Sequence, residues 1–443
     1  MKKRTARILT VLAAIVVALG VAYVIAVAVS AASLRRAYAE LEKDGRPMQM
    51  EDVIPPQIPD SENAALLYQS AILLLKAQPT ELGGLLSDLG GLCDSFLKGT
   101  IEPNELARLE ESIRRDVVSQ ALSIVQQGTR RPACRFDRQY SAGIQMDLPM
   151  SDIRQMAWTL CAKARFESQA GRPAEAWELL RTQLRFADAL VQEPVIISQL
   201  VRCSTIRMSC QAIQAMCEMT PPDPQQTTYL LNALKALDDI RPLILAMDGD
   251  RLLFGQWLLS LPKPELYKVI RKDLFTQDDA SDLWYWALFR WIHFRPVFLA
   301  DHAAYLRATH ESLRMVERPY SPDDRKDLVP PRHILTSMLV PGYARVKEVY
   351  LETAAQIRIT RAGLALLQYK RDHGAFPPTL DVLDAKEVAD PFVDQPLRYR
   401  VEPKGFVLYS LGKDQKDNGG VPQPADSKDK TDFDLVWRFP GER

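Results

Sequence analysis

Six aspartates lie close together near the carboxyl terminus, and they are the sequence's strongest candidate for metal chemistry. Hard cations such as Ca²⁺ prefer several oxygen ligands, which carboxylates and backbone carbonyls supply. Four lysines alternate with the acids and oppose a bound cation, so the segment also fits a solvated loop that pairs its own charges. The acids are Asp414, Asp417, Asp426, Asp429, Asp432 and Asp434, and the lysines are Lys413, Lys416, Lys428 and Lys430. Both interpretations stay open at this level.

The cysteines permit disulfides if the domain is exported. Cys203, Cys210 and Cys217 recur every seven residues along one predicted helix, so neighbours lie about 10 Å apart and cannot bridge one another. They share one helical stripe and are predicted to be core residues. Cys93 and Cys134 lie in segments broken by glycine or proline, which leaves a disulfide between them open. No Cys-x-x-Cys occurs, so neither a zinc ribbon nor a thioredoxin-like centre is supported.

No group of residues in the sequence identifies a reaction. Ser-x-x-Lys occurs three times without its partner motifs, and neither Gly-x-Ser-x-Gly nor a phosphate-binding Gly-x-x-x-x-Gly-Lys is present. His302 and His310 stand eight residues apart on a predicted helix, but a metal there needs a further ligand, so surface or interface positions are favoured. The sequence therefore favours a protein without catalytic activity. An envelope hydrolase with catalytic residues drawn from separate helices stays open as the alternative.

Composition and charge describe the scaffold that must position these residues. The chain has 443 residues, enough for two or three folded units at about 150 residues per domain. Lys plus Arg and Asp plus Glu both number 56, and this balance argues against nucleic acid as a partner. Hydrophobic residues at 47% and charged residues at 25% exclude a mainly disordered chain and a polytopic membrane protein.

One segment is apolar enough to cross a membrane. Residues 8–32 contain no charge and reach about 37 Å as a helix, against roughly 30 Å for the hydrocarbon core. The flank over residues 1–7 has four basic residues and no acid, which predicts a cytoplasmic amino terminus. We therefore expect an uncleaved signal-anchor that crosses the inner membrane once and leaves the carboxyl terminus in the periplasm. A signal peptide cut near residues 28–32 is the alternative, although its apolar core usually has only about 7 to 15 residues.

The rest of the chain is predicted to be mainly helical. Residues 33–60 continue the anchor as a juxtamembrane helix and then become a proline-rich linker. Residues 61–340 form a large periplasmic helical domain, in which Asp60 or Ser61 caps the first helix. Residues 341–443 form an α+β module of one long helix and a small antiparallel sheet.

Several elements within the helical domain are predicted from pattern and punctuation. The Gly-Gly pairs at 83–84 and 90–91 are expected to break helices, and one helix is expected over 103–127. Three antiparallel helices fit residues 150–219. The aromatic side chains concentrated between residues 284 and 294 are interpreted as core.

Alternation defines the faces of the terminal sheet. A helix over 343–372 ends at a His-Gly pair, and three alternating segments follow it. On the first predicted strand, Leu397 and Tyr399 share one face, while Arg398 and Arg400 share the other. We expect the apolar face to pack on the long helix.

The terminal module resembles the carboxyl-terminal part of the major pseudopilin of type II secretion. The segments that carry the resemblance are HGAFPPTLDVL, DPFVDQPLRYR, GFVLYSLGKDQKDNGG and DFDLVW, which cover about 100 of the 443 residues. In that family the loop corresponding to residues 412–434 holds calcium, and the positions that match best are Asp414 and Asp434. The resemblance therefore implies a calcium site with these two ligands.

The chain also departs from the pseudopilin pattern. The glycine of the anchor, Gly20, is followed by no glutamate at the fifth position, and the anchor lies more than 300 residues from the module. A filament subunit is therefore rejected, while shared ancestry of the module is kept. ENAALLY, PACRF and QEPVIISQLVR resemble membrane-anchored helical proteins of planctomycete-like bacteria, a family without an established activity. We expect a structural or protein-interaction scaffold whose partners are the inner membrane and an unidentified envelope protein; the oligomeric state stays open.

Overall fold

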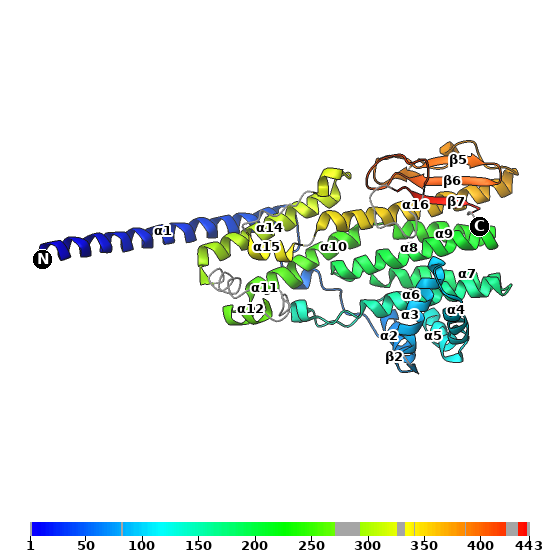
Figure 1. Ribbon diagram of the computed structural model, residues 1–443, viewed down its shortest axis with the longest axis horizontal. Coiled ribbons are helices and arrows are strands. Elements are labelled where there is room, and N and C mark those ends of the chain that lie inside the picture. The colour runs from blue at the N-terminus through cyan, green and yellow to red at the C-terminus, as the bar shows by residue number, and fades with distance from the viewer. Residues whose placement is uncertain are drawn as a thin grey trace.

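The protein is elongated, and its long amino-terminal helix projects from one end of a mainly helical body (Figure 1). The computed structural model describes residues 2–80, 83–270, 293–325, 333–340, 342–385, 387–421 and 433–440. Helices account for 69% of the chain, with small antiparallel sheets at the carboxyl end. This confirms the prediction of a mainly helical fold that ends in helix and sheet.

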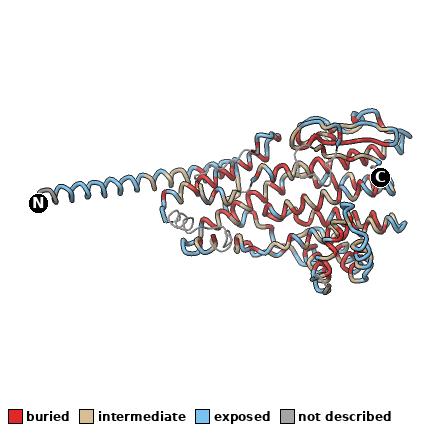
Figure 2. The backbone as a smooth tube through the Cα atoms, in the orientation of Figure 1, coloured by how far each residue is buried: buried red, intermediate tan, exposed pale blue. Residues whose placement is uncertain are grey.

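Helix α1, Lys2–Lys43, runs unbroken for 42 residues. Among the described residues it is the one helix long and apolar enough to cross a membrane, and its apolar part is not buried by the rest of the protein. Figure 2 shows this exposed stretch extending well beyond the body. As predicted, the helix continues past the uncharged segment and ends beside Gly45, whose φ of +67° is a left-handed conformation that favours glycine.

The first helices of the body form a compact group beside two very short strands. These elements are α2 (Ala64–Lys76), β1 (Pro79–Thr80), β2 (Gly83–Gly84), α3 (Leu85–Lys98), α4 (Pro103–Ile113) and α5 (Asp116–Gly128). The predicted N-cap of α2 at Asp60 or Ser61 is wrong, because Asn63 performs that role. Its Oδ1 accepts hydrogen bonds from the backbone N–H groups of Ala65 at 3.1 Å and Arg135 at 2.9 Å. The cap therefore also ties α2 to the loop after α5.

Two further expectations in this group are wrong. The single helix expected over 103–127 is divided at Arg115, whose ψ of 138° is extended and ends the helical path. The Gly-Gly pair at 90–91 does not break a helix and lies inside α3. Gly90 packs against the side chain of Gln155, where an added Cβ would come within 2.4 Å of that residue's Cγ. The glycine thus permits a close helix contact.

Three long helices form over residues 150–219, as predicted. They are α6 (Met150–Gln169), α7 (Pro173–Ala187) and α8 (Ile196–Met219). Gly171, with φ of +76°, makes the turn between α6 and α7. Cys203, Cys210 and Cys217 are all buried on α8, which confirms that they are core residues.

A series of mostly shorter helices leads towards the carboxyl-terminal part. They are α9 (Pro224–Leu237), α10 (Arg241–Gly249), a π-helical segment (Asp250–Gln256), α11 (Trp257–Ser260), α12 (Lys263–Val269), α14 (Arg295–Glu317) and α15 (Ile334–Leu339). Of the aromatic cluster predicted as core, Trp284, Trp286, Phe289 and Trp291 lie outside the described residues. Phe294 is described and is 49% exposed, so it is not a core residue.

The carboxyl-terminal part is one long helix with an antiparallel sheet. Its elements are α16 (Tyr343–His373), β3 (Ala389–Asp390), β4 (Gln395–Pro396), β5 (Arg398–Glu402), β6 (Gly405–Ser410) and β7 (Leu435–Phe439). The main sheet has the order β5-β6-β7, with Tyr399 opposite Leu408 and Leu408 opposite Trp437. Leu397 is buried and Arg400 is exposed, which confirms the predicted faces.

The long helix joins the sheet to the helical body through one apolar core. Cys210 of α8, Leu234 of α9, Leu364 of α16 and Phe406 of β6 all belong to the same buried cluster. Figure 2 shows the corresponding buried stretches along the facing sides of these helices. The carboxyl-terminal helix and sheet therefore share their core with the preceding helices.

Candidate functional site

Among the described residues, the two aspartates predicted as calcium ligands each have one buried oxygen without a hydrogen-bond partner. Asp434 is 3% exposed; its Oδ2 accepts from the Gly420 N–H at 2.8 Å, whereas no described residue pairs with Oδ1. Asp414 Oδ1 accepts from the Lys416 N–H at 3.2 Å, and no described residue pairs with its Oδ2. Burial raises the pKa of Asp434 above the usual aspartate value.

The neighbouring acids of this loop are partly used by the protein itself. Asp417 Oδ1 accepts from the hydroxyl of Tyr409 and from the Gly419 N–H, each at 2.9 Å. Asp426, Asp429 and Asp432 lie outside the described residues. Within the described part of the chain, no group of three or more His, Cys, Asp or Glu side chains is placed to hold a metal ion. The calcium site at Asp414 and Asp434 stays a prediction.

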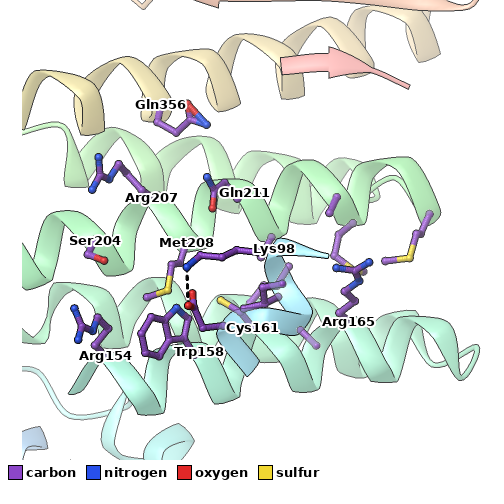
Figure 3. A pocket seen from close by; sticks show the side chains of 18 of the residues that line it. Lys98, Arg154, Trp158, Cys161, Arg165, Ser204, Arg207, Met208, Gln211 and Gln356 are labelled. Carbon is purple, nitrogen blue, oxygen red and sulfur yellow. Dashed lines mark hydrogen bonds and ion pairs between the residues drawn. The ribbon is translucent and has the colours of Figure 1, made fainter. Parts of the chain in front are cut away.

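A groove between α6 and α8 is the candidate binding site. Its volume is about 630 Å³, within the range of small-ligand pockets, and α3, α7, α16 and β7 complete its walls. Figure 3 shows how two facing helices supply most of its labelled side chains. Helix α6 contributes Arg154, Trp158, Cys161 and Arg165, and α8 contributes Ser204, Arg207, Met208 and Gln211.

Two of the four cations that line the groove are neutralised by acids that also line it. Lys98 lies 2.6 Å from Asp94 one turn earlier on α3, the contact drawn as a dashed line in Figure 3. Arg207 of α8 lies 2.9 Å from Glu352 of α16. Both lining acids are thus held by cations, unlike the unpaired carboxyl of a general acid.

The other two cations are Arg154, which is exposed, and Arg165, which is half-buried. The guanidinium of Arg154 lies 5.1 Å from the ring centre of Trp158. That of Arg165 lies 4.6 Å from the ring of Phe96, and its Nη1 donates to the Phe96 carbonyl at 3.2 Å. Neither has an acidic partner among the residues that the structure describes. Burial lowers the pKa of Arg165, as expected for a cation that leaves water without a carboxylate beside it.

Gln356 adds an unsatisfied acceptor to the wall formed by α16. The residue is 9% exposed, and its buried Oε1 has no hydrogen-bond partner in the described part of the chain. An orphaned buried carbonyl costs about 1–3 kcal/mol, which a bound donor would recover. Figure 3 shows Gln356 above the row of side chains on α8.

The sequence contains a signal for this groove that pattern reading missed. Arg154, Trp158, Cys161 and Arg165 follow spacings of four, three and four residues, so they share one face of α6. This face of α6 begins at an exposed arginine and ends at a half-buried one, with Trp158 and Cys161 between them. The opposite wall could not be anticipated, because it comes from a segment about 50 residues later.

The cysteines and histidines offer little chemistry in this arrangement. All six cysteines are free thiols, so the possible disulfide between Cys93 and Cys134 is not formed. Burial raises the pKa of Cys161, which lines the groove, to about 12 and makes it a poor nucleophile. His302 and His310 lie at the contact of α14 with α1, which agrees with interface positions: they approach Tyr38 at 3.2 Å and Asp44 at 2.8 Å.

Comparisons with protein-family models, with curated proteins and with solved structures found no match.

Proposed function

We propose that this protein is a single-pass inner-membrane protein whose helical body acts in the periplasm as a scaffold for an envelope protein. The observation that carries the proposal is the continuity of α1. The same 42-residue helix contains the apolar segment and packs into the body, without a flexible joint between them. A rigid connection of this kind suits a protein that must hold a partner at a fixed place relative to the membrane.

Contacts along α14 fix the part of α1 that follows the apolar segment. Ser33 accepts a hydrogen bond from Arg307 at 2.8 Å, and Tyr38 lies 3.2 Å from His302. At the end of the helix, the carboxylate of Asp44 accepts from both His310 and Arg314 at 2.8 Å. Apolar packing by Ala37 and Leu41 fills the space between these polar contacts. We refer to this polar and apolar contact as the α1–α14 clasp.

The position of the clasp supports a body that touches the bilayer. Tyr23 of α1 lies 5.7 Å, ring centre to ring centre, from Phe294 immediately before α14. About 20 residues cross the hydrocarbon core, so a span that starts at Ile8 ends near Val27, and Tyr23 lies in its outer half. Phe294 and Val297 are 49% and 38% exposed, and aromatic side chains favour the membrane–water interface. We propose that these two residues contact the outer leaflet of the membrane.

The chemistry of the groove favours binding over hydrolysis. A carboxylate-pair hydrolase requires one acid with a raised pKa in the cleft. The groove's acids, Asp94 and Glu352, are paired with cations instead. Asp250, whose pKa burial raises to about 7, accepts the Ile196 N–H at 2.9 Å and does not line the groove. The envelope hydrolase is therefore the less favoured alternative.

We also propose that residues 341–443 share ancestry with the pseudopilin module and retain its calcium site. Asp414 and Asp434 each have one carboxylate oxygen without a partner among the described residues, which supports calcium as the cofactor. We further propose that the chain is related to the membrane-anchored helical proteins of planctomycete-like bacteria.

Topology and partner binding are tested separately. A reporter fused after Arg443 should be active only outside the cytoplasm, and the mature chain should keep its amino terminus. A mature amino terminus near Ala31 would replace the anchor with a signal peptide. A photo-crosslinking residue at Gln211, which is exposed at the groove, should join one envelope protein in cells. The same residue at Arg130, exposed elsewhere, should give no such product, and equal products at both positions would contradict the scaffold role.

A further inference from the structure

We propose that the groove between α6 and α8 binds an extended acidic segment of a partner protein, about five residues long. The inference rests on the proposed scaffold role and specifies the partner's chemistry. Arg154 binds a carboxylate at one end of the segment, and Arg165 binds a carboxylate at the other end. Between them, an apolar side chain of the segment packs against Trp158 and Met208. Gln356 Oε1 accepts one backbone N–H of the segment.

The net charge of the groove is the first reason to propose an acidic segment. The pairs Lys98–Asp94 and Arg207–Glu352 cancel, which leaves the groove with two positive charges. Both belong to arginines, whose planar guanidinium binds carboxylates in a bidentate manner. The aromatic rings beside Arg154 and Arg165 hold the two guanidinium groups in place. Two oriented cations without acids form a receptor for two carboxylates.

The distance between the two arginines is the second reason, because it sets the length of the segment. Arg154 and Arg165 are 11 residues apart on α6, about 16 Å along the helix axis. An extended chain advances about 3.3 Å per residue, so carboxylates four residues apart would approach both arginines. A short dicarboxylate metabolite cannot bridge this separation.

The remaining lining suits a peptide backbone and a variable apolar side chain. The unpaired acceptor of Gln356 requires a donor, and each peptide residue other than proline supplies one. Met208, Met216 and Met219 line the same groove. Methionine adapts its flexible thioether to differently shaped apolar groups, which is common at surfaces that bind peptides.

The location of the groove separates this proposal from a lipid site. The apolar half of α1 projects from one end of the molecule, whereas α6 and α8 lie in the body towards the opposite end (Figure 1). An anionic lipid that remains in the bilayer therefore lies far from Arg165. A segment of a protein standing in the periplasm can reach it.

The experiment measures fluorescence anisotropy with the full chain in lipid nanodiscs. The probe is an amidated pentapeptide, glutamate-alanine-leucine-alanine-glutamate, with a neutral fluorophore; the matched peptide has glutamine in place of both glutamates. We expect the acidic peptide to bind at least about tenfold more tightly, because each charge-assisted contact contributes more than a neutral one. Binding should weaken as salt increases. Equal binding of the two peptides, or none at about 1 mM, would overturn the proposal.

Variants locate the binding site. Arg154→Gln and Arg165→Gln should each lower the affinity about tenfold or more. Arg130→Gln changes the net charge equally at an exposed position outside the groove, so it should leave the affinity unchanged. An equal loss of affinity in all three variants would show that net charge alone determines binding, and it would contradict the proposed site. Circular dichroism confirms that each variant remains folded.

The role of Gln356 has its own test. N-methylation of the probe, one amide at a time, should weaken binding to the natural chain at one position. Gln356→Met keeps a similar volume and should remove the sensitivity at that position. No sensitive amide, or the same sensitivity in Gln356→Met, would contradict the assigned hydrogen bond. Displacement of the probe by short-chain phosphatidylglycerol but not by unlabelled acidic peptide would assign the groove to a lipid and overturn the proposal. Because topology and partner crosslinking are measured independently, these outcomes leave the scaffold role to its own test.

Discussion

Asp44, immediately after the last residue of α1, accepts hydrogen bonds from His310 and Arg314 of α14 at 2.8 Å each. The bond from Arg314, and then that from His310, holds the pKa of Asp44 below its usual value. A carboxyl with a depressed pKa in the folded state stabilises the fold above its unfolded pKa, about 3.9. This stabilisation is lost as the pH falls through the folded value. One carboxylate thus makes the α1–α14 clasp dependent on acidity.

The first prediction concerns Asp44→Asn. The melting temperature should fall at neutral pH, because the charge that accepts from both α14 side chains is gone. The difference from the natural chain should shrink as the pH falls below about 4, where Asp44 of the unfolded chain becomes protonated, and should vanish below the lower pKa of the folded state. Melting curves by circular dichroism at several pH values measure this. Glu311→Gln removes the charge of an acid on α14 and serves as the control. If the difference in melting temperature between Asp44→Asn and the natural chain stays constant with pH, the charge of Asp44 does not explain it.

The second prediction concerns His302, which lies against Tyr38 in the same clasp. Burial lowers the pKa of His302 to about 4, so the folded state holds a neutral imidazole. Since the unfolded chain takes up a proton near pH 6.5, stability should fall from about pH 6.5 down to about pH 4. The full effect is about 3 kcal/mol at most. Chemical denaturation at pH 7 and pH 5 should show a smaller difference for His302→Gln. An equally steep loss in that variant would assign the pH dependence to other groups.

The third prediction tests the contact of α16 with the sheet. An added Cβ at Gly363 would come within 1.9 Å of the Trp437 ring. Gly363→Ala should therefore destabilise the protein by about 1–3 kcal/mol, although alanine favours helices. Gly91→Ala, in the open on α3, should be neutral or stabilising. Thermal unfolding followed by tryptophan fluorescence compares the two. A Gly363→Ala protein as stable as the natural chain would contradict the close packing.

The fourth prediction tests the strand register. Tyr399 packs on the shared core and donates its hydroxyl to the Pro377 carbonyl at 2.9 Å. Tyr399→Asp should lower stability by a few kcal/mol, since it brings an unpaired charge towards that core. Arg400→Asp, on the exposed face of the same strand, should cost much less. Denaturant midpoints for both variants measure the contrast. Equal losses would contradict the assigned faces.

The fifth prediction concerns calcium and uses the full chain, because the terminal helix and sheet share their core with α8 and α9. If Asp414 and Asp434 bind the ion, calcium at a hundredfold excess over Kd should stabilise the fold by about 2.7 kcal/mol. A chelator should lower the melting temperature, and Asp414→Ala should remove this response. Magnesium should substitute poorly, since it requires a tighter octahedral site. Identical melting with calcium and chelator would contradict the calcium site.

Local patterns predicted much of the fold. The uncharged run, the helices over 150–219 and the alternation around Tyr399 are periodic signals that continue over many residues, and the structure follows them. The errors lie where a contact distant in sequence overrules a local signal. Gly90 remains helical because it packs on Gln155, and Asn63 becomes the cap because Arg135 also binds it.

The groove shows the same limit for functional residues. The spacing of Arg154 and Arg165 is visible in the sequence. That no carboxylate among the described residues pairs with either arginine is a feature of the tertiary structure, which the spacing does not predict. The unpaired state of Gln356 Oε1 has no sequence signal at all. By contrast, the acidic loop is evident in sequence because its members are neighbours along the chain.

The unbroken path of α1 has a mechanical consequence in the proposed topology. An α-helix resists bending and twisting, and the clasp fastens it at several heights, so the body cannot swivel independently of its anchor. Any rotation of the body about the membrane normal must turn the whole transmembrane helix through the lipid. The groove then moves within a thin layer parallel to the bilayer, at one constant height. A partner segment that enters this layer searches two dimensions instead of three.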